Sequence, residues 1–551
     1  MPFTRAGCDV GAFSTANIVL ERTPFDVAKV FGPASPQAAE TTSNQTNDFI
    51  GAAIHCAIGS PLCTPQNNVV PVADLLPSEP GGYTSYKALF GLKYMIPVLG
   101  SLTDYNGNAI TGFSQLNFNP QPAQTLAVVE TMLKKGIPVV FAYIADAHDN
   151  HEGAPLSAES TFGPGEAPYV KQLSDYNAAF GTFFANLKAA GIDQSNTLFI
   201  FTPDEGDHFA GAAPSPANCD GAKIVNGVVS PDIPCTYPGG VGEIDYDLIA
   251  HVASPTVFSY HFDDAATVYV QGNPDPSSPS VRTLEQTMAA LNPVNPETGL
   301  AENILGTGLG ASLQGAIVDK VGQKLLHMSS ASDPNRDPTF TFFGDPNFFF
   351  ETTKLTTPFI GTGFAWNHGD IQPEIARTFI GMVGPGVRPI GVTQPTDFFT
   401  DHTDVRPTMM YLLGLNDDYQ HDGRVILEML DPNTLSGTLH AHSNTLLELG
   451  QIYKQINAPF ASLAQSTLTV STYAIESTSE GDTIYTNLEN RIASWTAQRD
   501  ALAAQIKGLL EQAQFSSLAI NEQQAKQLIS SSQTLLDQAS ACASSPAACA
   551  N

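Results

Sequence analysis

Basic residues are scarce in this chain of 551 residues, which has 24 lysines and arginines against 54 aspartates and glutamates. The resulting formal net charge of −30 excludes a nucleic-acid-binding domain that works by neutralising phosphates, and it disfavours anionic membrane surfaces. Charged residues of both signs make up only 14% of the chain, and the acidic residues form no long run. A disordered acidic tail is therefore not expected.

Long apolar segments are also missing. No apolar run reaches the roughly 18 residues of a membrane-spanning helix, so we expect no membrane span. Residues 1–21 lack a basic region followed by an apolar core, and so lack the pattern of a signal peptide. The hydrophobic fraction of 42% supports a sizeable core, in one large domain with insertions or in two to three domains.

The seven cysteines fall mostly in local pairs. Short-range disulfides in an oxidising compartment are the favoured interpretation, with free thiols as the alternative. Together with a surface built from Ser, Thr, Asn, Gln, Gly and Pro, the pairs indicate a secreted or periplasmic protein. No pair has the two Cys-x-x-Cys knuckles of a structural zinc site, and Cys8 is left over. The pairs are Cys56 with Cys63, Cys219 with Cys235, and Cys542 with Cys549.

Helix and strand patterns alternate in the first half of the chain. Residues 122–136 and 170–191 have the spacing of amphipathic helices. Residues 137–146 and 196–204 are apolar on both faces, as buried strands are. This order predicts an α/β fold with a mostly parallel sheet sandwiched by helices. In such sheets the functional groups gather at the carboxyl ends of the strands.

The alternation stops where Pro, Gly and Ser become frequent, and we interpret that stretch as a cap insertion. The α/β pattern resumes at 376–387 and 404–415, and the second segment predicts a helix capped by Asp404 with Pro407 in its first turn. The last part of the chain keeps helical spacing and predicts a helical hairpin. The expected domains are an N-terminally incomplete, discontinuous core, a cap and the hairpin, spanning residues 1–211 with 361–440, 212–360 and 441–551.

Acidic residues and histidines concentrate in four short stretches. Imidazole and carboxylate together suit zinc, manganese or iron, whereas oxygen ligands alone would suit calcium or magnesium. Each stretch also has a structural interpretation, as a solvated strand-end loop, a turn, a hydrogen-bonded histidine or a helix N-cap. Two of the stretches end the predicted strands, which favours a site. The stretches contain Asp146, His148, Asp149 and His151; Asp204, Glu205, Asp207 and His208; His368; and Asp401, His402 and Asp404.

The order and flanks of these stretches resemble the alkaline phosphatase superfamily, most closely its type I phosphodiesterase/nucleotide pyrophosphatase-like branch. The matching segments are YIADAHDNHEGAP, LFIFTPDEGDH, WNHGDIQPEIARTFIGMVGPGV and DHTDVRPTMMYLLGL, and the match covers residues 125–211 and 361–430. The resemblance implies an alkaline phosphatase-like sheet and an exported phosphoric ester hydrolase that uses two zinc ions on a small-molecule phosphoester. Manganese or iron could take the place of zinc.

By position, the resemblance assigns Asp146, His151 and His368 to one zinc ion. Three protein ligands with an open fourth position are typical of a catalytic zinc site. In the family the histidine stands four residues after the aspartate, whereas His151 stands five after and His148 two after. His151 is preferred because HEGAP continues the family's motif.

The second zinc ion would take its protein ligands from TPDEGDH. This segment offers two registers: the end of the strand favours Asp204 with Glu205, whereas ligand chemistry favours Asp207 with His208. The resemblance implies an imidazole at this place, so Asp207 and His208 are preferred and Asp204 is kept as a candidate.

The family's nucleophile segment has no counterpart in this chain. That segment is a strand that ends in an Asp or Asn ligand, followed by a Thr or Ser nucleophile, and residues 1–120 contain no such pattern. We therefore expect the nucleophile upstream of Met1, at most one good metal site, and little turnover. A sulfatase is excluded because CTPQN at Cys63 lacks the required arginine. The alternatives are a phosphomutase and a non-catalytic exported binding or surface protein; the sequence indicates no oligomeric state.

Overall fold

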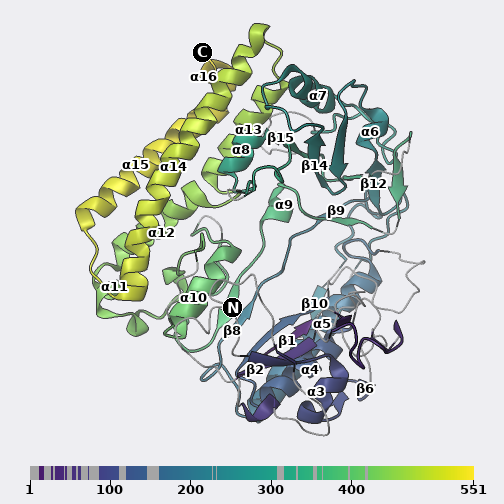
Figure 1. Cartoon of the computed structure of the whole chain (residues 1–551). Coiled ribbons are helices and arrows are strands. Elements are labelled where there is room, and N and C mark those ends of the chain that lie inside the picture. Colours follow the sequence, from purple (N-terminus) through teal and green to yellow (C-terminus); the bar gives the residue numbers. More distant parts are fainter. Residues whose placement is uncertain are drawn as a thin grey trace. The chain divides into compact units, whose positions relative to one another are not determined.

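The computed structural model shows a chain of helices and mostly short strands (Figure 1). It describes residues 12–17, 27–28, 32–42, 44–45, 52–57, 60–63, 72–73, 86–110, 120–145, 161–221, 223–225, 228–230, 233–306, 315–330, 333–351, 356–362, 364–394, 397–415 and 420–551. The fold class is mixed α/β, with a helical region at its C-terminal end.

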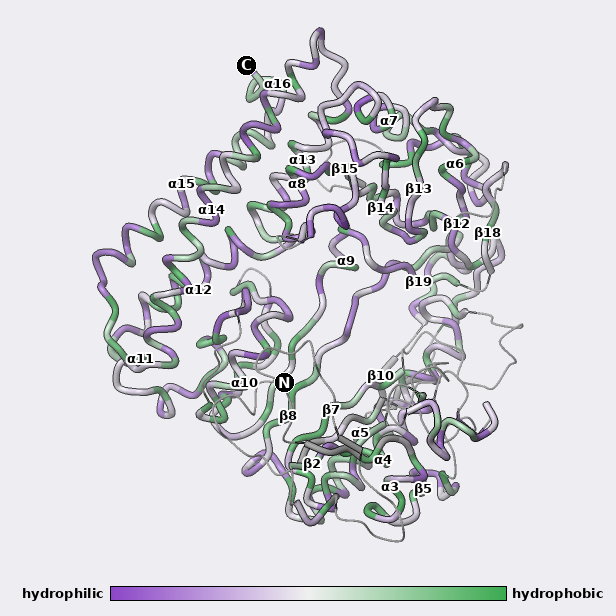
Figure 2. Tube along the Cα trace, viewed as in Figure 1, coloured by the Kyte–Doolittle hydropathy of each residue, from purple (hydrophilic) through white to green (hydrophobic). Residues whose placement is uncertain are grey.

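The C-terminal helical region is confirmed and is larger than the predicted hairpin. Along α14 and α15, hydrophilic and hydrophobic residues alternate as in amphipathic helices (Figure 2). α14 has 34 residues and packs against α15, while α13 packs on β15. Neither α14 nor any other helix of the described ranges is apolar over a stretch long enough to cross a membrane. These elements are α11 (Gly437–Ala441), α12 (Ser443–Asn457), α13 (Ser462–Glu476), α14 (Thr483–Ser516), α15 (Glu522–Ser544), α16 (Pro546–Cys549) and β15 (Ala316–Asp319).

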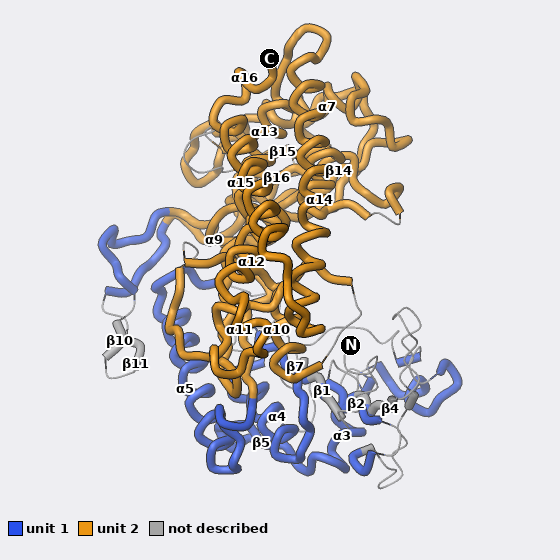
Figure 3. Tube along the Cα trace, turned by 90° about the vertical axis from the view of Figure 1, so that its left-hand side faces the viewer, with its two compact units in different colours: residues 1–197, 213–238, 417–419 blue, residues 198–212, 239–416, 420–551 orange. Residues whose placement is uncertain are grey.

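The chain divides into two compact units, coloured blue and orange in Figure 3. Unit 1 comprises residues 1–197, 213–238 and 417–419. Unit 2 comprises residues 198–212, 239–416 and 420–551.

Unit 1 contains a five-stranded sheet with strand order β3-β4-β2-β1-β7. β1 pairs with β7 in parallel, and the other pairings in this sheet are antiparallel. α4 packs on β1 and β7 and against α5. The elements of unit 1 are β1 (Ala12–Asn17), β2 (Ala52–Ala57), β3 (Val72–Ala73), β4 (Tyr86–Phe90), α3 (Leu92–Leu99), β5 (Leu102–Thr103), β6 (Ala109–Ile110), α4 (Pro122–Lys134), β7 (Val139–Tyr143), α5 (Ala167–Ala189), β10 (Lys223–Val225) and β11 (Val228–Ser230).

α4 and α5 confirm the two predicted helices of this unit. At the start of α4, the Gln124 side chain accepts a hydrogen bond of 2.8 Å from the backbone N–H of Gln121. α4 ends before Gly136, whose φ of 82° lies in the left-handed region that terminates a helix. α5 buries Phe183 and Leu187, whereas Leu173 and Phe184, which also have helical apolar spacing, are each 37% exposed. The spacing predicted the helix but only part of its buried face.

Unit 2 contains several small sheets. A four-stranded antiparallel sheet has the order β13-β14-β16-β15, and a three-stranded sheet has the order β17-β12-β18. One hydrophobic core joins Phe342 of β16 and Leu284 of α7 to Leu488 of α14. The remaining elements of unit 2 are β8 (Phe199–Phe201), β9 (His208–Phe209), β12 (Glu243–Tyr246), α6 (Leu248–His251), β13 (Phe258–His261), β14 (Ala265–Val270), α7 (Pro279–Ala289), α8 (Lys320–Leu325), β16 (Phe340–Phe343), β17 (Phe348–Phe350), β18 (Phe359–Gly361), β19 (Trp366–Asn367), α9 (Pro373–Ala376), β20 (Gly381–Val383) and α10 (Val405–Leu412).

The segments 137–146 and 196–204, expected as strands of one parallel sheet, form β7 and β8 in different sheets. β7 is an edge strand that pairs with β1, and its Phe141 side chain is 42% exposed. β8 pairs antiparallel with β20. The prediction that residues 137–146 form a buried strand is therefore wrong, because no residue of β7 is buried. An apolar run also does not specify the partner strand. The described strands therefore form several mostly antiparallel sheets, and the expected single parallel sheet is not among them.

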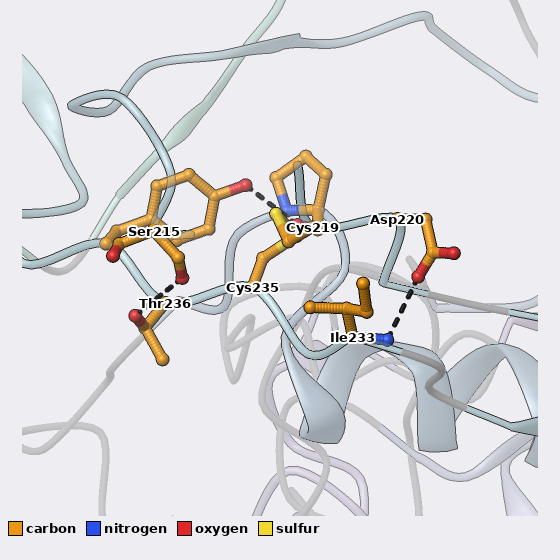
Figure 4. The surroundings of a disulfide bond; sticks show 8 residues. Ser215, Cys219, Asp220, Ile233, Cys235 and Thr236 are labelled. Atoms are coloured by element: carbon orange, nitrogen blue, oxygen red, sulfur yellow. Dashed lines mark hydrogen bonds between the residues drawn. A yellow bond between two sulfur atoms is a disulfide. The ribbon is translucent and has the colours of Figure 1, made fainter. Parts of the chain in front are cut away.

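The disulfides predicted from the local cysteine pairs are confirmed at two places. These are Cys219–Cys235 and Cys542–Cys549. Figure 4 shows Cys219–Cys235 beside the hydrogen bond from the Ile233 backbone N–H to Asp220. Cys56 is also disulfide-bonded, but the side chain of its predicted partner Cys63 lies outside the described residues.

Candidate metal centre

A short β-ribbon brings two of the acid-and-histidine stretches together within unit 2. β9 pairs antiparallel with β19, so that His208 lies opposite Asn367. Ahead of β9, the chain passes close to α9: a Cβ atom on Gly206 would lie 2.5 Å from the carbonyl oxygen of Ile375. Only glycine permits this approach. TPDEGDH and WNHGD are therefore held side by side.

Glu205, Asp207 and His368 form a group at the end of this ribbon. One ligand atom from each of the three side chains lies within 4.8 Å of the others. Nδ1 of His368 is 3.4 Å from Oε1 of Glu205 and 3.7 Å from Oδ1 of Asp207. Ligand atoms bound at about 2.0–2.1 Å from one tetrahedral zinc ion are roughly 3.3 Å apart. The spacing of the group is therefore close to what a single small cation requires.

The group is open to solvent. The side chains of Glu205, Asp207 and His368 are 32%, 23% and 46% exposed. An ion could enter without rearrangement of the core, and three protein ligands would leave a further position for water or substrate. Two carboxylates with one imidazole suit zinc, manganese or iron, so the donor chemistry fits the predicted metals.

Strand alternation explains which acidic residues join the group. Side chains two positions apart in an extended chain point the same way, as Glu205 and Asp207 do, whereas the next residue points to the opposite face. His208 accordingly lies outside the group: its Nδ1 is 3.0 Å from Oε1 of Glu374, and its Nε2 is 3.2 Å from Oδ1 of Asn347. The structure thus takes one residue from each predicted register.

Of the other predicted ligands, only Asp204 and His208 belong to the described residues, and neither joins this group. Asp204 is exposed just after β8. Asp146 and His151, which the resemblance assigns to zinc together with His368, lie outside the described residues. Glu205 was considered only in the alternative register, and its two-residue spacing from Asp207 is the signal that could have identified it.

Two buried aspartates lie beneath His368. The backbone N–H of His368 donates a hydrogen bond of 2.9 Å to Oδ2 of Asp264, and Gly369 makes the following turn with a φ of 83°. Burial, with the Glu243 carboxylate nearby, raises the pKa of Asp264 to about 9, and burial raises the pKa of Asp370 well above its usual range. One carboxyl oxygen of each aspartate has no hydrogen-bond partner among the described residues. With pKa values this high, both carboxyl groups carry a proton near pH 7, and a cation beside His368 would lower both pKa values.

The fourth stretch of acidic residues and histidine, residues 401–404, makes structural contacts outside this group. Asp404 stands at the N-cap position of α10, but its side chain makes no capping hydrogen bond to that helix. It accepts a hydrogen bond of 3.3 Å from the Asp401 backbone N–H in the preceding turn and pairs with buried Lys454 at 2.9 Å. Asp401 pairs with the same ammonium at 2.8 Å. Nε2 of His402 lies 2.7 Å from the hydroxyl of Thr202. The predicted N-cap position is therefore confirmed, but the side-chain cap is wrong, because Asp401 caps the preceding turn and Asp404 compensates a buried lysine.

Comparison with known proteins identifies no relative of this chain: no protein-family model, curated protein or solved structure matches it. The resemblance to the alkaline phosphatase superfamily thus remains a prediction from short motifs. The functional argument depends on the geometry of the group in unit 2.

Proposed function

We propose that this chain is a metal-dependent phosphoric ester hydrolase, of phosphodiesterase or phosphatase type, that binds its metal ion through Glu205, Asp207 and His368. One observation carries the proposal: ligand atoms from two segments far apart in the sequence lie within 4.8 Å of one another, on side chains that solvent can reach. Exposed carboxylates alone would be weak support, but the imidazole gives the group a donor set typical of zinc.

The charges of the chain favour a cation-assisted reaction. A bound metal would polarise a phosphoryl oxygen and lower the pKa of a coordinated water molecule. Glu205 and Asp207 would hold the ion by charge, and His368 would contribute the Nδ1 lone pair. With a net charge of −30, the protein would repel an anionic phosphoester unless a cation were present at the site.

The finer parts of the proposal come from the resemblance. They are membership of the alkaline phosphatase superfamily with its parallel sheet, zinc as the ion, and Asp146 and His151 as additional ligands. A small-molecule phosphoester is the substrate class that this membership implies. Export to an oxidising compartment is supported by the disulfides of the chain.

The test combines metal analysis with a chromogenic phosphodiester and a chromogenic phosphomonoester. The purified protein is expected to hold one zinc ion per chain. It should hydrolyse at least one ester slowly and in a zinc-dependent way, because residues 1–120 contain no nucleophile pattern. His368→Ala and Asp207→Asn should lose both properties, whereas His440→Ala, at an exposed histidine of α11, should keep both. A wild-type protein that binds no divalent metal would contradict the proposal. Metal binding without hydrolysis of either ester would favour the non-catalytic binding protein.

A further inference from the structure

Three buried carboxyl groups meet in unit 2 where α7, β15 and the start of α14 pack together. Glu285 and Asp319 are 0% exposed, and Glu489 is 6% exposed. The guanidinium of Arg282 lies among them and donates to Oε2 of Glu285 at 2.7 Å. The same guanidinium also binds Asp482 at 2.7 Å, so one positive charge faces more acidic groups than it can neutralise.

The donors around Asp319 are well defined. Its Oδ1 accepts hydrogen bonds from the backbone N–H groups of Val321 and Gly322 at the start of α8, at 2.8 and 3.3 Å. Its Oδ2 accepts a hydrogen bond of 2.5 Å from the hydroxyl of Tyr485. These three donors favour the ionised form of Asp319 and oppose burial, which raises its pKa.

Glu489 has the opposite environment. Neither of its carboxyl oxygens accepts a hydrogen bond from an N–H or hydroxyl group of the described residues, and its carboxyl group lies beside that of Asp319. Ionised carboxylates only accept hydrogen bonds, so a carboxyl–carboxyl contact requires a proton on one partner. Burial, followed by the charges of Asp319 and Glu285, raises the pKa of Glu489 well above its usual range. Glu489 is therefore the protonated donor of the pair.

We propose that the proton on Glu489 acts as a latch: it fastens the first turns of α14 to β15 and α8, and alkaline pH releases it. Tyr485 lies one turn before Glu489 and binds the same aspartate, so both contacts of α14 converge on Asp319. α13 contributes backbone carbonyls, those of Ala474 and Ile475, which accept hydrogen bonds from Arg282.

The direction of the pH effect follows from linkage. Because the pKa of Glu489 is raised in the folded protein, its contribution to stability is complete below the ordinary carboxyl pKa and is lost as the pH rises through the raised pKa. Once the proton has left, Asp319 and Glu489 are both negative. Burial also raises the pKa of Glu285 well above its usual range, and Arg282 is the cation that faces the three carboxyl groups. The repulsion acts on α14, whose first turns carry both Tyr485 and Glu489.

Glu489→Gln tests the latch, because its amide donates to Asp319 without a titratable proton. Unfolding equilibria would be measured for wild type, Glu489→Gln and the control Asp537→Asn, an exposed carboxyl of α15, from about pH 4 to about pH 9. Between the two pKa values, the folding equilibrium constant of the wild type should fall about tenfold more per pH unit than that of Glu489→Gln. The control should follow the wild type. Equal pH dependence of wild type and Glu489→Gln would overturn the proposal.

Amide hydrogen exchange of the wild type gives an independent readout that needs no variant. After correction for the intrinsic rate, residues 483–492 of α14 should open more readily at alkaline pH than residues 505–516 of the same helix. An opening free energy of residues 483–492 that stays constant across the pH range would also overturn the proposal.

Discussion

Two acidic clusters of unit 2 contain similar side chains but balance their charge in different ways. The group of Glu205, Asp207 and His368 is partly exposed and includes an imidazole. The carboxyl cluster around Glu489 is closed, and its charge is balanced by Arg282 and by a proton. Burial thus decides whether solvent and a dissolved cation can do the neutralising, or whether the protein must supply the counter-charge itself.

This difference predicts which property each cluster controls. Changes in the closed cluster should act on folding, because an unmatched buried charge has no access to water. Changes in the open group should act on ligand binding and leave folding nearly unaffected, because hydration screens its charges.

The largest effect is expected from Arg282→Met. This change removes the buried guanidinium and leaves Glu285 and Asp482 without their cation, which should lower the free energy of unfolding by about 3–5 kcal/mol. Chemical denaturation followed by circular dichroism measures the loss. Arg491→Met, at an exposed arginine of α14, is the matched control and should change stability by less than about 0.5 kcal/mol. Similar losses in both variants would show that the cluster is not closed.

Zinc should stabilise the protein through the open group. At about 100 times the dissociation constant, a ligand that binds only the folded state adds about 2.7 kcal/mol to the free energy of unfolding. Thermal unfolding with and without zinc should show this gain for wild type and for Glu489→Gln, but not for His368→Ala. A chelator should reverse it. If His368→Ala kept the full gain, zinc would be binding elsewhere.

Asp264 should affect the zinc affinity of the open group through its hydrogen bond to the His368 backbone. Asp264→Ala removes the acceptor that holds the His368 backbone N–H and should weaken zinc binding about tenfold. Asp264→Asn retains an acceptor oxygen and should weaken it much less. Competition with a chromophoric chelator measures both affinities. Equal losses in the two variants would mean that the charge of Asp264, and not its hydrogen bond, supports the site.

The smallest effect is expected in unit 1, at an exposed ion pair. Lys171 and Asp175 are 2.7 Å apart on α5, with side chains 60% and 38% exposed. Lys171→Ala should therefore cost only about 0.3–0.5 kcal/mol of unfolding free energy, and less at high salt. If Lys171→Ala lowered the free energy of unfolding as much as Arg282→Met, exposed and buried ion pairs would not differ in their contribution to stability.

Local features of the fold were predictable from the sequence, whereas long-range pairing was not. The helices α4 and α5 follow from periodicity, and the disulfides follow from cysteine spacing. The pairing of β8 with β20 could not be predicted, because the sequence of an apolar strand does not specify its partner strand.

The candidate site shows the same limit. Asp207 and His368 were identified by type and order, but the exchange of His208 for Glu205 depends on which way an extended segment turns its side chains. The sequence contained no pattern that predicted the closed carboxyl cluster. Glu285 and Glu489 lie on helices, where a single glutamate has the pattern of a surface residue until its neighbours are known.

The interleaving of the two units has a consequence for synthesis on the ribosome. The chain leaves unit 1 after residue 197 and returns to it at residues 213–238. In that returning segment, the Cys235 backbone N–H donates to the Gly165 carbonyl at 3.1 Å, and the Tyr237 hydroxyl donates to the Pro164 carbonyl at 2.7 Å. The nascent chain must therefore deliver β8 and β9 of unit 2 before it can complete unit 1, and a gene fragment that stops at codon 197 does not encode either unit.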